Sequence, residues 1–213
     1  YWVKRFDKYQ VKHHGIKTQF GIKILEFSDF DDQDYALFSD ENDQGVQGGT
    51  PWLNGPVPLE FAIYGLGPIY FRVNQPKLME KVLTQSLSFN KTDKEDNFER
   101  YQTGQGGNGA SVIVEERHDL PLARQGYGGV HHVAFGVDDT SDLDEWIKVL
   151  NQLRAPHSGH VDRFYFKSLY TRLYPGILFE FATNGPGFID DEEPYETLGE
   201  LLALPPKFRH LRS

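Results

Sequence analysis

The hydrophobic and polar positions of this chain follow a pattern that recurs after 144 residues (146 − 2 and 157 − 13). Trp2-Val3-Lys4 is matched by Trp146-Ile147-Lys148, and His13-His14-Gly15 is matched by His157-Ser158-Gly159. The apolar residues around the first tryptophan have helical spacing, and β-rich sequence follows both histidines. The β-rich stretches are residues 18–27, 35–38, 163–173 and 177–181. Each copy is therefore predicted to run from a helix into strands.

A third copy of the pattern lies between these two. Its helix is predicted to begin at Pro76, because proline suits the first turn and Leu78, Val82 and Leu83 then share one side. The predicted elements are a strand at 67–73, a helix at 76–87, strands at 98–101 and 110–115, and, opening the last copy, a strand at 129–137. The repeating unit is thus interpreted as one strand, one helix and three more strands.

Such βαβββ units cannot bury their sheet faces alone, so they are expected to pair around a concave site. The predicted fold class is α+β, with repeated βαβββ units forming cup-shaped mixed sheets. The predicted segments are the C-terminal part of a second unit (1–44), a linker (45–62), a third unit (63–120), a fourth unit (121–190) and a C-terminal tail (191–213). The tail, with four leucines between residues 198 and 204, is expected to form a short helix followed by an extended end. Because residue 1 already lies in a helical pattern, we expect that upstream residues are missing.

The composition removes several classes of function. The net charge is −9, so the chain lacks the basic surface that binds nucleic acid or anionic membranes. It contains no cysteine, which excludes disulfides, thiolate metal sites and cysteine nucleophiles. No apolar run reaches the roughly 18 residues of a membrane span. We expect no nucleic-acid or membrane partner, a cytoplasmic location, and a homo-oligomer as a candidate assembly.

Two polar residues stand out within predicted apolar strands. Side chains alternate along a strand, so His132 shares a face with Ala134 and Gly136, while His131 shares the bulkier face. Glu180 likewise shares the smaller face of its strand, and an unpaired carboxylate there is costly to bury unless an arginine or a metal ion compensates it. His132 and Glu180 are therefore candidate metal ligands.

This pair occurs in the last copy alone. Ile69 and Tyr70, or their neighbours, correspond to the two histidines in the third unit, and Ser39 corresponds to Glu180 in the first copy. A residue pair needed for folding the repeat should occur in every copy, so its asymmetry favours a function. A 2-His-1-carboxylate site needs one more histidine, which is expected to lie in the missing N-terminal unit.

Several segments resemble the hydroquinone-type ring-cleaving dioxygenases of the vicinal-oxygen-chelate (glyoxalase/bleomycin-resistance) superfamily. The similar segments are 128–135, 162–166, 168–170 and 175–180, with Pro205-Pro206 near the end. The resemblance implies an Fe(II) ion, with Mn(II) as the second candidate, held by His132 and Glu180. It implies His131, Arg163 and Tyr170 as catalytic groups. The implied activity is extradiol-type cleavage of a small hydroquinone- or catechol-like aromatic diol by dioxygen.

Other interpretations remain open for each of these groups. Arg163 could stabilise phenolate charge or could be a surface charge, and Tyr170 could move a proton or could be a core aromatic residue. His131 could move a proton or could pack under the helix. For the whole chain, the alternatives are a glyoxalase-type metal-dependent lyase or isomerase and a non-catalytic protein that binds an aromatic ligand or drug.

Overall fold

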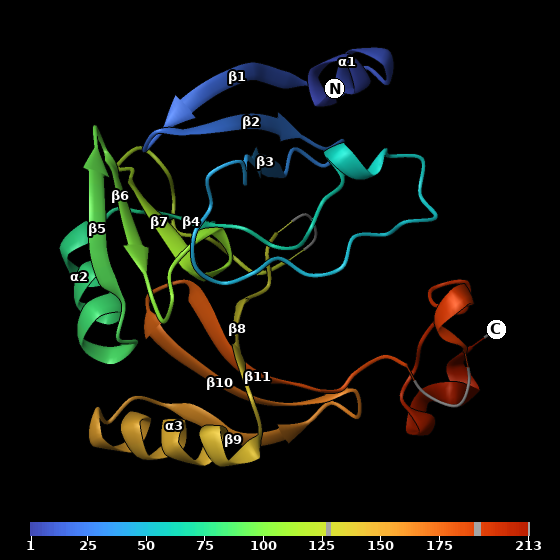
Figure 1. Cartoon of the computed structure of the whole chain (residues 1–213). Helices are drawn as coiled ribbons and strands as arrows, with labels where there is room; N and C mark the ends of the chain where they lie inside the picture. The colour runs from blue at the N-terminus through green and yellow to red at the C-terminus, as the bar shows by residue number, and fades with distance from the viewer. Residues whose placement is uncertain (127–128, 190–192, 213) are drawn as a thin grey trace. The chain divides into compact units, whose positions relative to one another are not determined.

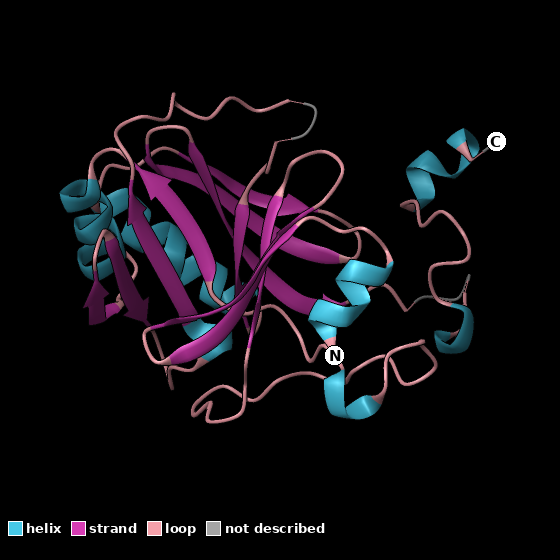
Figure 2. Ribbon diagram, turned by 90° about the horizontal axis from the view of Figure 1, so that it is seen from above, coloured by secondary structure: helices cyan, strands magenta, loops and turns pink. Residues whose placement is uncertain are grey.

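The computed structural model describes residues 1–126, 129–189 and 193–212 and consists of two compact units (Figure 1). Unit 1 comprises Tyr1–Pro121 and Gly126–Gly129, and unit 2 comprises Leu122–Gln125 and Val130–Ser213. Strands make up most of the regular structure of both units (Figure 2). No helix within the described ranges is both long and apolar enough to cross a membrane.

Unit 1 contains a three-stranded sheet and a four-stranded sheet. Its elements are α1 (Trp2–Lys8), β1 (His13–Gln19), β2 (Ile22–Ser28), β3 (Asp34–Phe38), β4 (Ile69–Val73), α2 (Pro76–Lys81), β5 (Asn90–Glu95), β6 (Phe98–Gln102) and β7 (Ser111–Glu116). A π-helical turn, Val82–Ser86, extends α2. The larger sheet has the order β4-β7-β6-β5, and only the β4–β7 pair is parallel.

Unit 2 repeats the arrangement of the four-stranded sheet of unit 1. Its elements are β8 (Val133–Val137), α3 (Thr140–Gln152), β9 (His157–Asp162), β10 (Phe166–Tyr174) and β11 (Ile177–Pro186). The sheet order is β8-β11-β10-β9, again with a parallel pair formed by the first and last strands. The predicted α+β class with βαβββ units and mixed sheets is therefore confirmed.

One face of the unit 2 sheet is buried by α3. The helix begins after Asp139, whose side chain accepts a hydrogen bond from the backbone N–H of Ser141. The Trp146 ring stacks on Phe181 with 4.2 Å between ring centroids, and Phe179 is also fully buried. Because side chains alternate, Glu180 points to the opposite face of the sheet.

The sequence repeat corresponds to a repeated local structure. The Nδ1 atoms of His13 and His157 each accept a hydrogen bond from the backbone N–H of the glycine two residues later, both at 3.1 Å. Gly15 and Gly159 have φ angles of +74° and +67°, which favour glycine, and a register shift lies beside each. The other ring nitrogen of His157 contacts Asn151 Oδ1 at 3.2 Å. These histidines therefore stabilise the irregular backbone near the start of β1 and β9.

Replacing His157 with alanine is expected to lower the free energy of unfolding by about 1 kcal/mol, because the Gly159 N–H loses its acceptor. Urea denaturation of both proteins would measure the difference. His14→Ala, at an exposed position, serves as the control and should change stability by less than about 0.5 kcal/mol. Equal effects of the two substitutions would contradict a structural role for His157.

Three sequence predictions are corrected by the structure, and one strand was missed. Residues 18–27 are not one strand, because a turn at Phe20 and Gly21 joins β1 to β2. Residues 163–173 include a turn as well, so β9 ends at Asp162 and β10 begins at Phe166. β8 begins at Val133 instead of residue 129, which leaves His131 and His132 before the strand. The strand β5 was missed, since its sequence is wholly polar.

The tail also differs from its prediction. The leucine-rich stretch predicted as a short helix follows a single 3-10 turn at Tyr195–Thr197, and the end predicted as extended is a 3-10 helix at Pro206–Leu211. The buried carboxylate of Glu193 accepts backbone hydrogen bonds from residues 199, 200 and 201, which holds this stretch in turns. Gly128 of the resembling segment and the predicted boundary between residues 190 and 191 lie outside the described residues.

Candidate metal centre and active site

His132 and Glu180 meet on the face of the unit 2 sheet that α3 leaves open. Parallel pairing of β8 with β11 sets Glu180 opposite Ala134, two residues after His132. The Nε2 atom of His132 lies 2.6 Å from Oε2 of Glu180. Glu180 is 1% exposed, whereas the His132 side chain is about one-third exposed. A buried carboxylate oxygen and a partly exposed imidazole nitrogen are thus in direct contact.

Ser168 holds the other oxygen of the same carboxylate. Its hydroxyl donates a hydrogen bond to Oε1 of Glu180, and Ser168 is fully buried in β10. Sequence analysis gave Ser168 no role. The alternation of β10 could have indicated it, because residues 168 and 170 share the face of Glu180.

Tyr170 and Arg163 extend this group of polar side chains. Tyr170 lies opposite Glu180 in the sheet, and its ring stands edge-on to the His132 ring with 6.0 Å between centroids. Its hydroxyl accepts hydrogen bonds from Nε and Nη2 of Arg163 at 3.2 and 3.1 Å. Burial, followed by the hydrogen bond with Glu180, raises the pKa of Tyr170 against the opposing effect of Ser168 and Arg163. The hydroxyl therefore keeps its proton.

His131 does not pack under the helix. Because β8 begins only at Val133, His131 is exposed and its Nδ1 lies 2.8 Å from Nδ1 of His132. One of these nitrogens must carry the proton that the other accepts. Its backbone oxygen accepts a hydrogen bond from Gln125. All five residues singled out by the sequence, together with Ser168, are thus linked by contacts within unit 2.

The donor set fits a divalent metal ion. It offers one imidazole nitrogen and one carboxylate oxygen on the open face, and such N and O donors suit Fe, Mn and Zn. The second ring nitrogen of His132 has a partner in His131, as is usual for metal-bound histidine. Among the described residues no group of three or more such side chains could hold a metal. Within the described residues, His132 and Glu180 are thus a pair of candidate ligands, one fewer than a 2-His-1-carboxylate site requires.

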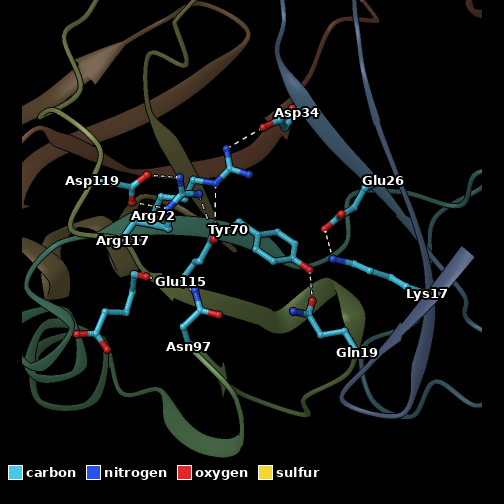
Figure 3. Close-up of polar contacts among 11 residues, drawn as sticks. Lys17, Gln19, Glu26, Asp34, Tyr70, Arg72, Asn97, Glu115, Arg117 and Asp119 are labelled. Atoms are coloured by element: carbon cyan, nitrogen blue, oxygen red, sulfur yellow. Dashed lines mark hydrogen bonds and ion pairs between the residues drawn. The ribbon is translucent and has the colours of Figure 1, made fainter. Parts of the chain in front are cut away.

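The corresponding region of unit 1 carries ion pairs in place of these ligands (Figure 3). Ile113 takes the place of Glu180, since it lies one residue before the partner of Phe71 just as Glu180 lies one before the partner of Phe135. Arg72 bridges Glu115 at 2.8 Å and Asp34 at 2.7 Å, and Glu115 is 8% exposed.

Two neighbouring contacts complete this cluster. The Tyr70 hydroxyl donates a hydrogen bond to Gln19, and burial raises its pKa. Arg117 contacts Glu115 at 3.3 Å and Asp119 at 2.6 Å. The charges of this region are paired with one another, so they join β3, β4 and β7 within unit 1.

Arg72→Met is expected to destabilise unit 1 by about 1–3 kcal/mol at neutral pH, because Glu115 loses a charged donor in a buried position. The hydrogen bond from Arg72 lowers the pKa of Asp34 below its ordinary value of 3.8. That carboxyl therefore contributes stability above its ordinary pKa and loses the contribution as the pH falls through the lowered value. The difference in the free energy of unfolding between wild type and variant should therefore become smaller below about pH 4. Urea titrations at several pH values would measure it. A constant difference would contradict the role of Asp34.

Comparison with known proteins places the chain in a family, although no family model matches it. It is 40% identical over 218 residues to a protein named ring-cleaving dioxygenase MhqA of Bacillus subtilis (strain 168), covering 100% of this chain and 68% of that protein. It is 27% identical to the chlorohydroquinone/hydroquinone 1,2-dioxygenase of Sphingobium indicum, with coverage of 100% and 66%. The chain thus spans about two thirds of the length of these relatives.

Comparison with solved structures leads to the same family as comparison of the sequences. The crystal structure of a Bacillus subtilis protein described as a dioxygenase superposes with a TM-score of 0.83 at 29% identity, covering 99% of this chain and 66% of that one. A glyoxylase/bleomycin resistance protein/dioxygenase domain from Frankia sp. EAN1pec has a TM-score of 0.50 at 18% identity, covering 59% and 95%, and supports the fold alone. The chain therefore belongs to the ring-cleaving dioxygenase family and has the vicinal-oxygen-chelate fold of the glyoxalases and bleomycin-resistance proteins.

Proposed function

We propose that this chain carries two metal ligands and the acid–base groups of an Fe(II)-dependent, extradiol-type ring-cleaving dioxygenase. The substrates would be dioxygen and a small hydroquinone- or catechol-like diol, and Mn(II) is the second candidate ion. The main support is the contact between His132 and Glu180 on the open face of the sheet. The name of the Sphingobium relative supports the choice of a hydroquinone-like substrate.

In this proposal His132 and Glu180 hold the ion, and a third protein ligand comes from outside the described residues. When bound, ferrous iron would bring the diol and dioxygen together and allow electron density to pass between them. The contact with His131 fixes the ring orientation and tautomer of His132. Because Glu180 is buried, bulk water does not compete with the ion for its carboxylate.

Arg163, Tyr170 and His131 would handle charge and protons. The guanidinium of Arg163 is a permanent cation that can stabilise a phenolate as the diol loses its proton. Arg163 also donates to the Tyr170 oxygen, so the phenolic proton of Tyr170 is the one shared with Glu180, and it would be donated to a substrate oxygen that takes the place of that carboxylate. His131 is exposed beside His132, and its Nδ1 can accept the proton that the diol releases when the His131 ring turns away from the Nδ1–H of His132.

The direct test is oxygen uptake by a protein that contains this chain together with the source of the third ligand, after anaerobic addition of Fe(II). Hydroquinone or chlorohydroquinone should consume oxygen in an iron-dependent manner, with loss of the aromatic absorbance. Consumption should stop when iron is removed with a chelator. Absence of oxygen uptake with every hydroquinone and catechol tried would rule out the proposal and would favour a lyase or isomerase of the same fold.

Arg163→Ala is expected to lower kcat about 10- to 1000-fold, because the developing phenolate loses its cation. Mn(II) affinity should stay within about twofold of the wild type, since Arg163 contacts Tyr170 and neither proposed ligand. Arg172→Ala is a suitable control, because that arginine contacts Gln125 in the same unit. Equal losses of activity in both variants would contradict the proposed role of Arg163 in stabilising the phenolate.

A second candidate is a non-catalytic protein that binds an aromatic ligand. It is favoured by a cavity of about 340 Å³ in unit 2, which is lined by Tyr165, Phe188 and tail residues and by none of the proposed site residues. Such a protein would bind an aromatic ligand without metal, and His132→Ala would leave that affinity unchanged. A cytoplasmic location and a homo-oligomer remain predictions from the sequence.

A further inference from the structure

We propose that Ser168 is a positioning residue that restricts Glu180 to one-oxygen coordination of the ion. This inference rests on the proposed function, because it assumes that His132 and Glu180 share a metal. Ser168 lies in the segment 168–170 that resembles the family, but no role was assigned to it from the sequence.

The contacts of Glu180 divide its two oxygens between different partners. Oε1 accepts the hydrogen bond of Ser168 at 2.5 Å, and Oε2 lies 2.6 Å from Nε2 of His132. Ser168 and Glu180 are 0% and 1% exposed, so water cannot readily replace the serine as the donor. The hydroxyl therefore fixes the rotation of the carboxylate and presents Oε2 toward the imidazole.

This arrangement has a consequence for the number of open positions on the ion. A site with two histidines and one carboxylate keeps the most positions for substrate and dioxygen when each ligand occupies one position. A carboxylate free to rotate can offer both oxygens and occupy another position. By holding Oε1, Ser168 would keep that position available for the second substrate oxygen or for dioxygen.

The test uses Mn(II) as a probe, with binding to the whole chain followed by loss of the free-ion EPR signal. Ser168→Ala is expected to weaken Mn(II) binding about 10- to 100-fold, as is typical when a partner of a metal ligand is removed. Ser168→Thr, which retains the hydroxyl, should recover most of the affinity. Thr171→Ala is the matched control: it removes a buried hydroxyl from the same strand, but that hydroxyl donates to the backbone oxygen of Pro156 on the other face.

A second readout counts the water molecules on bound Mn(II) through the relaxation rate of water protons. The Ser168→Ala protein should show fewer bound waters than the wild type at saturating Mn(II), because both oxygens of Glu180 become available. A merely structural role would change thermal stability and leave this number as it is. Unchanged water number or unchanged affinity in Ser168→Ala would overturn the inference.

His132→Ala separates this failure from a failure of the proposed function. If wild type binds Mn(II) and His132→Ala does not, the metal site stands, and the Ser168 variants alone decide the inference. If wild type and His132→Ala bind Mn(II) equally, or neither binds it, the proposed metal site is wrong and the inference is overturned with it.

Discussion

Glu180→Gln should abolish specific Mn(II) binding. This loss is larger than the roughly 10- to 100-fold loss of metal affinity that follows when a partner of a metal ligand is removed. The amide has nearly the same shape as the carboxylate and can still accept the Ser168 hydrogen bond, but it carries no charge to attract a cation. The fold should be retained, because the packing of the buried side chain is preserved. EPR titration with Mn(II), together with circular dichroism of the variant, would measure both effects.

Glu115→Gln is the matched control for this experiment. Glu115 is also a buried carboxylate on the last strand of a βαβββ unit, but its partners are Arg72 and Arg117. The control variant should lose stability, because two arginines lose their anionic partner, while Mn(II) binding stays unchanged. If Glu115→Gln abolished Mn(II) binding and Glu180→Gln did not, the metal site would have been assigned to the wrong unit.

Phe181→Ala is expected to cost about 3–5 kcal/mol of the free energy of unfolding, the range for deleting a large buried aromatic side chain. Phe181 is 2% exposed and is stacked on Trp146, so its removal leaves a void between the sheet and α3. Urea denaturation followed by circular dichroism would measure the change. Phe30, which is fully exposed, provides the control, and Phe30→Ala should cost less than about 0.5 kcal/mol. A loss below about 1 kcal/mol for Phe181→Ala would show that α3 does not depend on this contact.

The repeat could be predicted from the sequence because it is carried by whole motifs. The helix with its tryptophan and the histidine–glycine turn recur at one offset, and each has a distinct local structure. The turns inside 18–27 and 163–173 escaped prediction for a physical reason. Phe20 and Phe164 adopt positive φ angles of 51° and 72°, which residues other than glycine rarely do, so an apolar residue that suggests a strand stands in each turn. In the first turn, the only glycine of the usual pair of turn residues is Gly21, with a φ of 75°.

The missed strand has a different cause. β5 lies at the edge of its sheet, and its residues, Asn90 to Glu95, are largely exposed. Edge strands commonly carry charged residues that prevent pairing with other molecules, so hydrophobic alternation is lost there. Patterning can detect a strand only where one of its faces is buried.

The candidate site was only partly predictable. Strand alternation predicted that His132 and Glu180 face the same side. Their 2.6 Å contact depends on the register of β8 with β11, which local sequence does not specify. The position of His131 depended on where β8 begins, and strand boundaries are poorly defined by sequence. Ser168 carries no distinctive signal, because a buried serine has importance only through its partner.

The parallel pairing of β8 with β11 would link binding of the proposed ion to the folding of unit 2. These are its first and last strands along the chain, so the contact between His132 and Glu180 joins residues separated in sequence by α3, β9 and β10. An ion held by this pair would bind the native state and not the unfolded chain, and mass action would then raise the melting temperature with ion concentration. The concentration of the proposed ion would then set the stability of unit 2 as well as the occupancy of its site.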